Sequence, residues 1–530
     1  MRILITDGLD EAGLALLKEH AEVEVHRNMP KAELLAALPQ YDALIVRSST
    51  QVTDEILAAG TRLRVVGRAG TGVDNIDVEA ATRRGIAVVN APTGNSNAVA
   101  EHTIALMLAL ARSLYGAIAS LKAGRWEKSG LQGHEVKGKI LGLIGLGRIG
   151  ALVASKAKGL EMRVMAFDPY VTSARAASLG VELASLDEVL SQADFLSVHT
   201  PLTPQTHGLL GRKELARLKP TAYVLNCARG GIIDEEALEE ALREGRIAGA
   251  GLDVFEVEPA TSSRLIGLPN VIATPHVGAS TAEAQQQVAI DVAQAVLDVL
   301  QGRIPATPVN LPYVPPQALG FLQPYLDLAR RMGTFFFQWH GTLANRLELV
   351  YEGEVCEYDT RLLSAAFLEG LLSHTTAQPV NLVNANLIAE RRGLAISEMC
   401  LPTSAVYESL ITARLQNGEV NRSISGAVIQ GEPHLVTLDD QRLTCVLAGH
   451  MLVDLHLDRP GIVGRMGLIL GDEGINISFV QMSRAQRGGA QIMILGLDEP
   501  VSPTLLPRFQ QVPNVQRVRA ISLPPLNSTE

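Results

Sequence analysis

The sequence predicts an α/β protein with two tandem parallel-sheet lobes, followed by an α+β region and a small βαββαβ unit. Short β-branched runs alternate with helical patterns twice, over residues 2–90 and again over 139–280. Such alternation is typical of βαβ units and a parallel sheet. A proline-dense stretch at 304–317 follows the second series, and a further alternation begins near residue 451.

The bulk composition narrows the classes of function. The chain has 530 residues and a net charge of −10, so it offers no basic field for nucleic acid and is long enough for several domains. The apolar run 104–111 is too short to span a bilayer, which argues against a membrane protein. The four cysteines lie far apart in sequence, which favours a reducing, cytoplasmic location and no metal site.

The elements of the first lobe follow from its apolar runs. Strands are expected at 3–6, 23–26, 43–47, 64–67 and 86–90. A single long helical pattern then covers 95–121, with Asn95 and Ser96 at the capping position.

The second series repeats this alternation. Its strands are expected at 140–145, 163–168, 195–199, 222–226 and 248–255, and a helical pattern at 282–300 closes it. The prolines of 304–317 remove backbone donors and indicate a linker. Residues 318–447 have mixed signals, and 448–525 follow the strand–helix–strand–strand–helix–strand order of a ferredoxin-like unit.

The glycine loop of the second lobe predicts a dinucleotide site. Gly145, Gly147 and Gly150 follow an apolar strand and enter a helical pattern, and Asp168 ends the next strand. These glycines suit a tight turn, approach of a pyrophosphate and helix–strand packing, respectively. A carboxylate at 168 suits the ribose hydroxyls and repels a 2′-phosphate, so NAD is favoured over NADP. The alternative is that the glycines serve packing alone.

Polar residues follow three strands of the same predicted sheet. Arg229 follows one strand, an acidic group with Asp253, Glu256 and Glu258 follows another, and His276 follows a third. In an open α/β sheet, ligands bind beyond the carboxyl ends of the strands. Each residue alone is most simply structural, but together they can bind a 2-hydroxy or 2-keto acid and move its proton.

Two longer stretches suggest a family. SQADFLSVHTPLTPQTHGLLG (191–211) and LKPTAYVLNCARGGIID (218–234) resemble signatures of the D-isomer-specific 2-hydroxyacid dehydrogenases. The resemblance covers residues 1–303. It implies a flavodoxin-like substrate lobe, 1–94 with 285–303, into which a Rossmann NAD domain, 95–284, is inserted. It also explains why the glycine loop stands so far from the start of the sequence.

The resemblance implies specific roles. Arg229 would bind the substrate carboxylate, His276 would be the acid/base, and Glu258 would pair with His276 and favour its protonated form. The remaining positions implied for the cofactor are Thr71, Gly145, Gly147, Arg148, Ile149, Gly150, Asp168, Thr200, Cys227, Ala228, Asp253, Val277, Gly278 and Ala279.

The substrate is suggested by the first lobe and the C-terminal unit. Arg47, Arg68 and Gly70 lie near strand ends, where the arginines could hold a second anionic group or be merely solvated. DRPGIVGRMGLILGDEGINIS (458–478) resembles an ACT domain, and 318–447 resembles an intervening domain. Family members with both oxidise 3-phospho-D-glycerate to 3-phosphohydroxypyruvate, the first step towards L-serine. Glyoxylate, hydroxypyruvate or 2-oxoglutarate chemistry, or a non-enzymatic NAD-sensing scaffold, are the alternatives.

Regulation and assembly are further implications of the resemblance. Asp458 and Asn476 match positions that contact L-serine in inhibited relatives, although an ACT domain that only mediates assembly is the alternative. The segment 124–139 helps to form a dimer interface in the family, with Trp126 as its expected anchor. A homo-oligomer, a dimer or tetramer, is therefore expected. Arg391 and Arg392 could hold an anion or simply be solvated.

Overall fold

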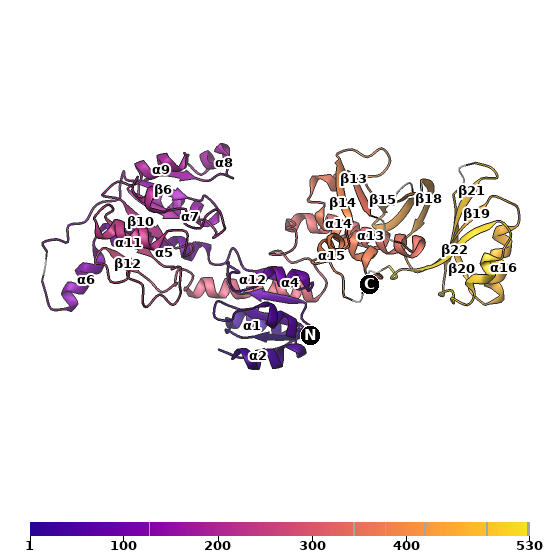
Figure 1. Ribbon diagram of the computed structural model, residues 1–530, viewed down its shortest axis with the longest axis horizontal. Coiled ribbons are helices and arrows are strands. Elements are labelled where there is room, and N and C mark those ends of the chain that lie inside the picture. The colour runs from indigo at the N-terminus through magenta and orange to yellow at the C-terminus, as the bar shows by residue number, and fades with distance from the viewer. Residues whose placement is uncertain (127, 343–344, 377, 418–419, 484–485, 527–530) are drawn as a thin grey trace.

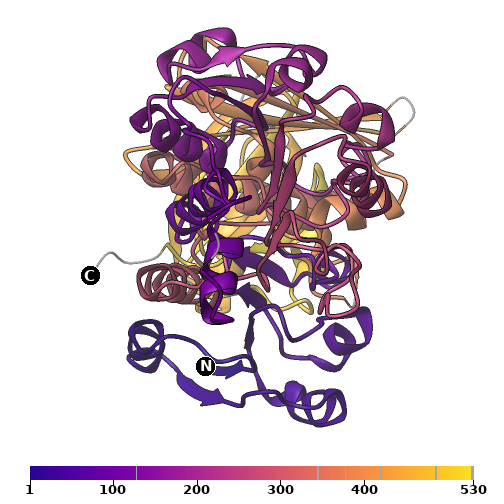
Figure 2. The ribbon, with the colours of Figure 1, turned by 90° about the vertical axis from the view of Figure 1, so that its left-hand side faces the viewer.

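The computed structural model describes residues 1–126, 128–342, 345–376, 378–417, 420–483 and 486–526. Four sheets follow one another along the chain. Figure 1 shows two α/β lobes at one end, a mixed domain in the middle and a small α/β unit at the other end. Figure 2 shows the first lobe, in indigo, beneath the second.

The first lobe is a five-stranded parallel sheet in the order β2-β1-β3-β4-β5, the flavodoxin-like order expected from the sequence. Its strands and helices are β1 (Arg2–Ile5), α1 (Glu11–Lys18), β2 (Glu22–Val25), α2 (Lys31–Ala37), η1 (Leu38–Gln40), β3 (Ala43–Val46), α3 (Asp54–Ala59), β4 (Val65–Arg68), α4 (Val78–Arg83) and β5 (Ala87–Asn90).

The chain returns to this lobe after building the second one. Helix α12 (Ala282–Leu300) packs on α1 and on strands β4 and β5. A Cβ atom on Gly13 would lie 2.6 Å from the carbonyl oxygen of Ala289, so glycine permits this close helix crossing. The insertion of one lobe into the other is therefore visible in the packing.

The second lobe is a seven-stranded parallel sheet in the order β12-β11-β10-β9-β6-β7-β8. This is the Rossmann order with one strand added. The sequence did not predict the two-residue strand β8. The elements are β6 (Ile140–Ile144), α7 (Arg148–Gly159), β7 (Arg163–Phe167), α8 (Ser173–Ser178), β8 (Glu182–Leu183), α9 (Leu186–Gln192), β9 (Phe195–Val198), α10 (Arg212–Leu215), β10 (Tyr223–Asn226), α11 (Glu235–Arg243), β11 (Gly249–Leu252) and β12 (Val271–Ala273).

The prediction of a single helix over 95–121 is wrong. The chain forms α5 (Ser96–Ala111) and α6 (Leu114–Lys122), bent by 68° at Ser113, which has a left-handed φ of 45°. Asn95 does not cap α5 with its side chain, because its Oδ1 accepts a hydrogen bond from Thr71 Oγ1 at 2.7 Å. Within the described ranges, no single helix is long and apolar enough to cross a membrane. Helices α5 and α6 reach that length and apolar character only when they are taken together as this bent pair.

The proline-dense segment after α12 is held against the first lobe. The Val309 N–H donates to the Val88 carbonyl at 2.8 Å, and the Val88 N–H donates to Asn310 Oδ1 at 2.8 Å. The segment thus extends along β5 before α13 begins, so part of the predicted linker is fixed to the sheet edge.

The middle domain is a mixed sheet in the order β14-β13-β15-β16-β17-β18, covered by long helices. Strand β14 is parallel to β13, and the other neighbours are antiparallel. Its elements are α13 (Pro316–His340), β13 (Arg346–Gly353), η2 (Glu354–Glu357), α14 (Arg361–Leu372), α15 (Ala385–Arg391), β14 (Ala395–Leu401), β15 (Ser409–Asn417), β16 (Val420–Ile429), β17 (Glu432–Leu438) and β18 (Gln441–Val446).

The C-terminal unit has the predicted βαββαβ order, with an antiparallel sheet β20-β21-β19-β22. Its core merges with that of the middle domain, where Met451, Ile492 and Ile521 join the cluster around α13 and α14. The elements are β19 (His450–Leu457), α16 (Ile462–Asp472), β20 (Ile477–Met482), β21 (Ala490–Leu497), α17 (Leu506–Gln510) and β22 (Val515–Ser522).

Candidate active site

The glycine loop forms the start of α7 as a phosphate-binding turn would. Gly145 has a φ of 96°, a conformation that L side chains rarely adopt. A Cβ atom on Gly150 would lie 2.3 Å from the Gly145 carbonyl oxygen, whereas a Cβ on Gly147 would meet nothing within 4 Å. The helix N-terminus has no side-chain cap, and the exposed Arg148 is its first residue. Open space and free N–H groups at a helix start suit a pyrophosphate.

Asp168 lies beside this loop at the end of β7. Its Oδ2 accepts a hydrogen bond from the Leu146 N–H at 2.8 Å, and its Oδ1 accepts from the N–H groups of Tyr170 and Val171 at 2.9 and 3.2 Å. The carboxylate therefore ties the strand end to the glycine loop. It remains half-buried, so a ribose diol can still approach it.

His276 and Glu258 form a direct pair. The Nδ1 atom of His276 lies 2.8 Å from Glu258 Oε2, and Glu258 Oε1 accepts a hydrogen bond from the Phe255 N–H at 3.1 Å. His276 has a left-handed φ of 53°, uncommon for a side chain of its size. Its N–H donates to the Asp253 carbonyl at 2.8 Å, which helps to hold this conformation.

Asp253 organises the loop that carries His276. Its carboxylate is 1% exposed and accepts hydrogen bonds from Thr274 Oγ1 at 2.6 Å and from the N–H groups of Val277 and Gly278, each at 2.8 Å. Burial alone would raise the pKa of Asp253, but His102, Thr274 and the two N–H groups lower it to about 2. The residue is thus a buried anion, and its expected contact with the cofactor is untested.

Arg229 bridges the two lobes. Its Nε donates to Asp74 Oδ2 at 2.9 Å, and its Nη1 donates to the Ala228 carbonyl at 2.7 Å. A Cβ atom on Gly72 would lie 1.8 Å from Arg229 Nη2, so this glycine admits the guanidinium. Asn226 shapes the turn, because its side chain accepts from the Ala228 N–H and donates to the Arg229 carbonyl.

Arg68 of the first lobe lies within electrostatic reach of Arg229. A Cβ atom on Gly70 would lie 1.5 Å from Arg68 Nη1, so a side chain at position 70 would displace the guanidinium. Burial lowers the pKa of Arg68 to about 10, and repulsion from Arg229 and Arg47 adds to the effect. Its Nε is buried without a hydrogen-bond partner. Arg68 therefore combines positive neighbours with an unused buried donor, which is an arrangement that favours an anion.

The remaining positions expected around the cofactor are distributed between the lobes. Thr71 bonds Asn95, and the Oγ1 of Thr200 is buried without a hydrogen-bond partner. Burial raises the pKa of the Cys227 thiol to about 12, so this side chain is an uncharged thiol at neutral pH. Ala228, Ile149, Val277 and Ala279 are partly buried.

Two histidines were not singled out from the sequence. His102 Nε2 lies 3.0 Å from Thr274 Oγ1 and 3.4 Å from Asp253 Oδ1. His199 is half-buried, its Nε2 lies 2.9 Å from Ser197 Oγ, and desolvation of its imidazole lowers its pKa to about 4. The sequence could have marked His199, since it ends the apolar strand in the quoted stretch 191–211. His102 gave no such signal because it lies within a helix.

The two residues expected to contact an effector do not meet within one chain. Strands β19 and β20 are both antiparallel to β21 and therefore run in the same direction. Asp458 follows the end of β19, whereas Asn476 precedes the start of β20, so the two lie at opposite ends of the sheet. Asp458 Oδ2 accepts from the Gly488 N–H at 3.1 Å, and Asn476 donates to Asp498 at 2.7 Å.

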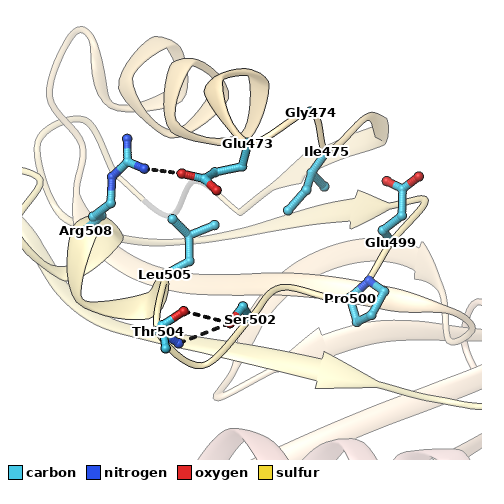
Figure 3. Close-up of a pocket in the computed structure, with 9 residues that line it drawn as sticks. All are labelled: Glu473, Gly474, Ile475, Glu499, Pro500, Ser502, Thr504, Leu505 and Arg508. Carbon is cyan, nitrogen blue, oxygen red and sulfur yellow. Dashed lines mark hydrogen bonds and ion pairs between the residues drawn. The ribbon is translucent and has the colours of Figure 1, made fainter.

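A cavity of about 440 Å³ lies at the Asn476 end of this sheet. Figure 3 shows that Glu473 and Arg508 pair at its wall, while Ile475, from the same loop as Glu473, and Glu499, from the loop after β21, also line it. No motif in the sequence marked this cavity, because its walls come from two separate loops and from Arg508 of α17.

The fold and the site together define a class of protein. The second α/β lobe carries a dinucleotide-type glycine loop and a His–Glu pair, and its Arg229 meets Asp74 of the first lobe and acts electrostatically on Arg68 there. This combination defines a nicotinamide-dependent dehydrogenase of small acids.

Comparison with known proteins gives the family. The description "D-isomer specific 2-hydroxyacid dehydrogenase, NAD binding domain" matches residues 104–278, "D-3-phosphoglycerate dehydrogenase intervening domain" matches 321–439, and "ACT domain" matches 450–514. Proteins named D-3-phosphoglycerate dehydrogenase from Methanocaldococcus jannaschii and Bacillus subtilis are 44% and 39% identical. Each alignment covers 99% of this chain and 100% of the relative. The chain therefore belongs to the D-3-phosphoglycerate dehydrogenase family.

Solved structures match the two-lobed part. The TT0316 protein from Thermus thermophilus is 40% identical with a TM-score of 0.55, covering 58% of this chain and 100% of its own. D-lactate dehydrogenase from Aquifex aeolicus, complexed with NAD and lactic acid, is 27% identical with a TM-score of 0.54. The match covers 58% of this chain and 99% of the dehydrogenase chain.

Proposed function

We propose that this protein oxidises 3-phospho-D-glycerate to 3-phosphohydroxypyruvate with NAD, as the names of its full-length relatives suggest. One structural observation supports this substrate above unphosphorylated acids. Arg229 and Arg47 both repel the charge of the buried Arg68, and Arg68 keeps a buried N–H without a partner. A substrate with a carboxylate and a phosphate would relieve that repulsion from both ends.

The residues divide the work as follows. Arg229 holds the carboxylate and orients the reacting C2 hydroxyl, while Arg68 and Arg47 take the phosphate. The glycine loop and α7 hold the pyrophosphate, and Asp168 holds the ribose. The chemistry that NAD supplies when bound is acceptance of a hydride from C2.

His276 moves the proton. In oxidation its Nε2 takes the proton of the C2 hydroxyl, and in reduction it returns that proton to the keto oxygen. Glu258 accepts from Nδ1, fixes the tautomer and stabilises the charged imidazole. The Arg229–Asp74 contact between the lobes supports a closure that would bring substrate and proton acceptor together and exclude water.

The first experiment is NADH oxidation by the purified chain with 3-phosphohydroxypyruvate, beside hydroxypyruvate, 2-oxoglutarate and glyoxylate. We expect the phosphorylated acid to have the highest kcat/KM, and Arg68→Met to raise its KM while leaving that for hydroxypyruvate nearly unchanged. If glyoxylate or hydroxypyruvate were preferred and Arg68→Met changed all substrates equally, the phosphate assignment would be wrong.

A homo-oligomer built through α6 belongs to the same proposal. Leu114, Tyr115, Ile118, Leu121 and Trp126 are 47–79% exposed, and Figure 1 shows α6 projecting from the second lobe. Apolar groups gathered on a projecting helix favour a partner surface, here a second copy. Light scattering of Trp126→Glu beside the parent chain tests this, because loss of a dimer or tetramer is expected.

We also propose that the C-terminal unit binds a small effector, with L-serine as the first candidate. The ACT match supports an effector site of this kind. Since Asp458 and Asn476 lie at opposite ends of one sheet, an effector that uses both would need two copies of the unit. Serine titration of wild type, Asp458→Asn and Asn476→Ala tests the assignment by inhibition and by calorimetry.

A further inference from the structure

Two cysteines of the middle domain lie side by side. Strand β13 pairs with β14 so that Tyr351 faces Cys400, and the chain turns after β13 into η2, which carries Cys356. The Cys356 thiol donates to the carbonyls of Tyr351 at 3.2 Å and of Leu401, the neighbour of Cys400, at 3.4 Å. Leu401 directly follows Cys400 on β14, so the Cys356 thiol lies against the strand segment that carries Cys400.

The two thiols differ in access. Cys400 is exposed on the edge strand β14, whereas Cys356 is half-buried behind it. Burial and the neighbouring Cys400 raise the pKa of Cys356 to about 11, so Cys356 is a protonated thiol and the exposed Cys400 is the sulfur that an oxidant reaches first. An exposed thiol with a second thiol behind it is the arrangement of an attacking and a resolving cysteine.

We propose that Cys356 and Cys400 form a reversible disulfide in the folded chain when a peroxide is the oxidant. The Cys400 sulfur attacks one peroxide oxygen, the O–O bond breaks, and one water leaves, so that Cys400 becomes a sulfenic acid. The Cys356 sulfur then attacks that sulfur, the S–S bond forms, and the hydroxyl leaves as water with the Cys356 proton. Two thiols are oxidised and one peroxide is reduced to two waters.

The disulfide would close a loop that contacts the substrate lobe. Gln378 Nε2 donates to the Arg83 carbonyl and Asn381 Nδ2 donates to the Gly85 carbonyl, each at 2.7 Å. Both donors lie between Cys356 and Cys400 in sequence. Glu398 of β14 already accepts from Thr360 and Ser364 of the same loop, so the strand and α14 are joined next to the two thiols. The inference does not depend on the substrate proposed above.

The test uses the full-length reduced protein and hydrogen peroxide. After oxidation the protein is alkylated, digested without reductant and analysed by mass spectrometry. We expect a peptide pair joined through residues 356 and 400 within one chain, which a dithiol reductant separates. Cys227 and Cys445 are matched internal controls, because burial raises the pKa of each to about 12 and both should remain reduced. Recovery of all four cysteines as thiols, or a bond between two chains, would overturn the proposal.

Two single variants separate the order of events. In Cys356→Ser, Cys400 should accumulate as a sulfenic acid that a dimedone probe labels, whereas in Cys400→Ser the remaining Cys356 should stay reduced. Oxidised wild type should show slower amide exchange over 378–384, reversed by reductant and absent in Cys356→Ser. If Cys356 were oxidised in Cys400→Ser, the assignment of the attacking and resolving roles would be wrong. If amide exchange over 378–384 were unchanged in the disulfide-bonded wild type, the link between the disulfide and this segment would be wrong.

Discussion

Glu258 Oε2 lies 2.8 Å from His276 Nδ1, and the same carboxylate accepts the Phe255 N–H through its other oxygen. One oxygen of the carboxylate is thus held by the backbone of its own loop, and the other contacts the imidazole. A Glu258→Gln substitution keeps the size of the side chain but removes the charge. We expect kcat to fall by roughly 10²–10⁴-fold, as for loss of a proton-transfer group, with NADH affinity unchanged. Steady-state rates and NADH fluorescence titration check this, with His276→Ala as the reference; unchanged kcat would contradict it.

Two glycines of the cofactor loop should respond in opposite ways to the same change. In Gly147→Ala the new methyl group meets no protein atom within 4 Å, so the fold should persist while the pyrophosphate is displaced. In Gly150→Ala the methyl group would lie 2.3 Å from a backbone oxygen, and we expect a loss of roughly 1–3 kcal/mol of stability. Thermal melting and the KM for NAD distinguish the two. Equal melting temperatures would refute the packing argument.

The cofactor preference should depend on the charge of Asp168. Asp168→Ser removes the carboxylate that repels a 2′-phosphate, so the ratio of kcat/KM for NAD over NADP should fall by at least about tenfold. Part of the loss should appear as a higher KM for NAD, because the Leu146 N–H also loses its acceptor. Rates with both cofactors test this, and Asp187→Ser, an exposed acid on α9, is the control.

Asp253 should make a pH-dependent contribution to stability. Because its pKa falls from about 4 when unfolded to about 2 when folded, its contribution of about 2 kcal/mol is complete above pH 4. That contribution is lost as the pH falls from about 4 to about 2. Asp253→Asn should therefore be less stable at pH 7, and the difference should shrink in acid. Urea unfolding followed by circular dichroism checks the trend; a constant difference would exclude this origin.

The contact between the middle domain and the C-terminal unit should depend on Arg331. This side chain is buried and donates to the carbonyls of Leu447, Pro524 and Pro525. Arg331→Met would leave these oxygens without their donor and cost roughly 2–4 kcal/mol. Amide exchange at 447–449 and 520–523 should accelerate, while the exposed Arg346→Met should have no effect. No acceleration would show that apolar packing alone joins the two parts.

Local patterns in the sequence predicted most of the architecture. The apolar runs gave the major strands of the first two sheets, because a strand buried on both faces is apolar whatever it pairs with. The glycine loop and the acid after the next strand also form a local signal. The helical pattern over 95–121 led to the wrong prediction of one helix, because 3.6-residue periodicity does not reveal the left-handed turn at Ser113 that separates α5 from α6.

The sequence by itself determined the types of group at the active site: a histidine, an acid and arginines at strand ends. Only the tertiary structure decided which of them meet. The Glu258–His276 pair agrees with the family resemblance, but the structure alone uses Asp253 to hold the loop and adds His102 from a distant helix. It also separates Asp458 from Asn476 and brings Cys356 to Cys400. The reason is physical: strand order and direction set these distances, and pairing between distant strands leaves no periodic signal in the chain.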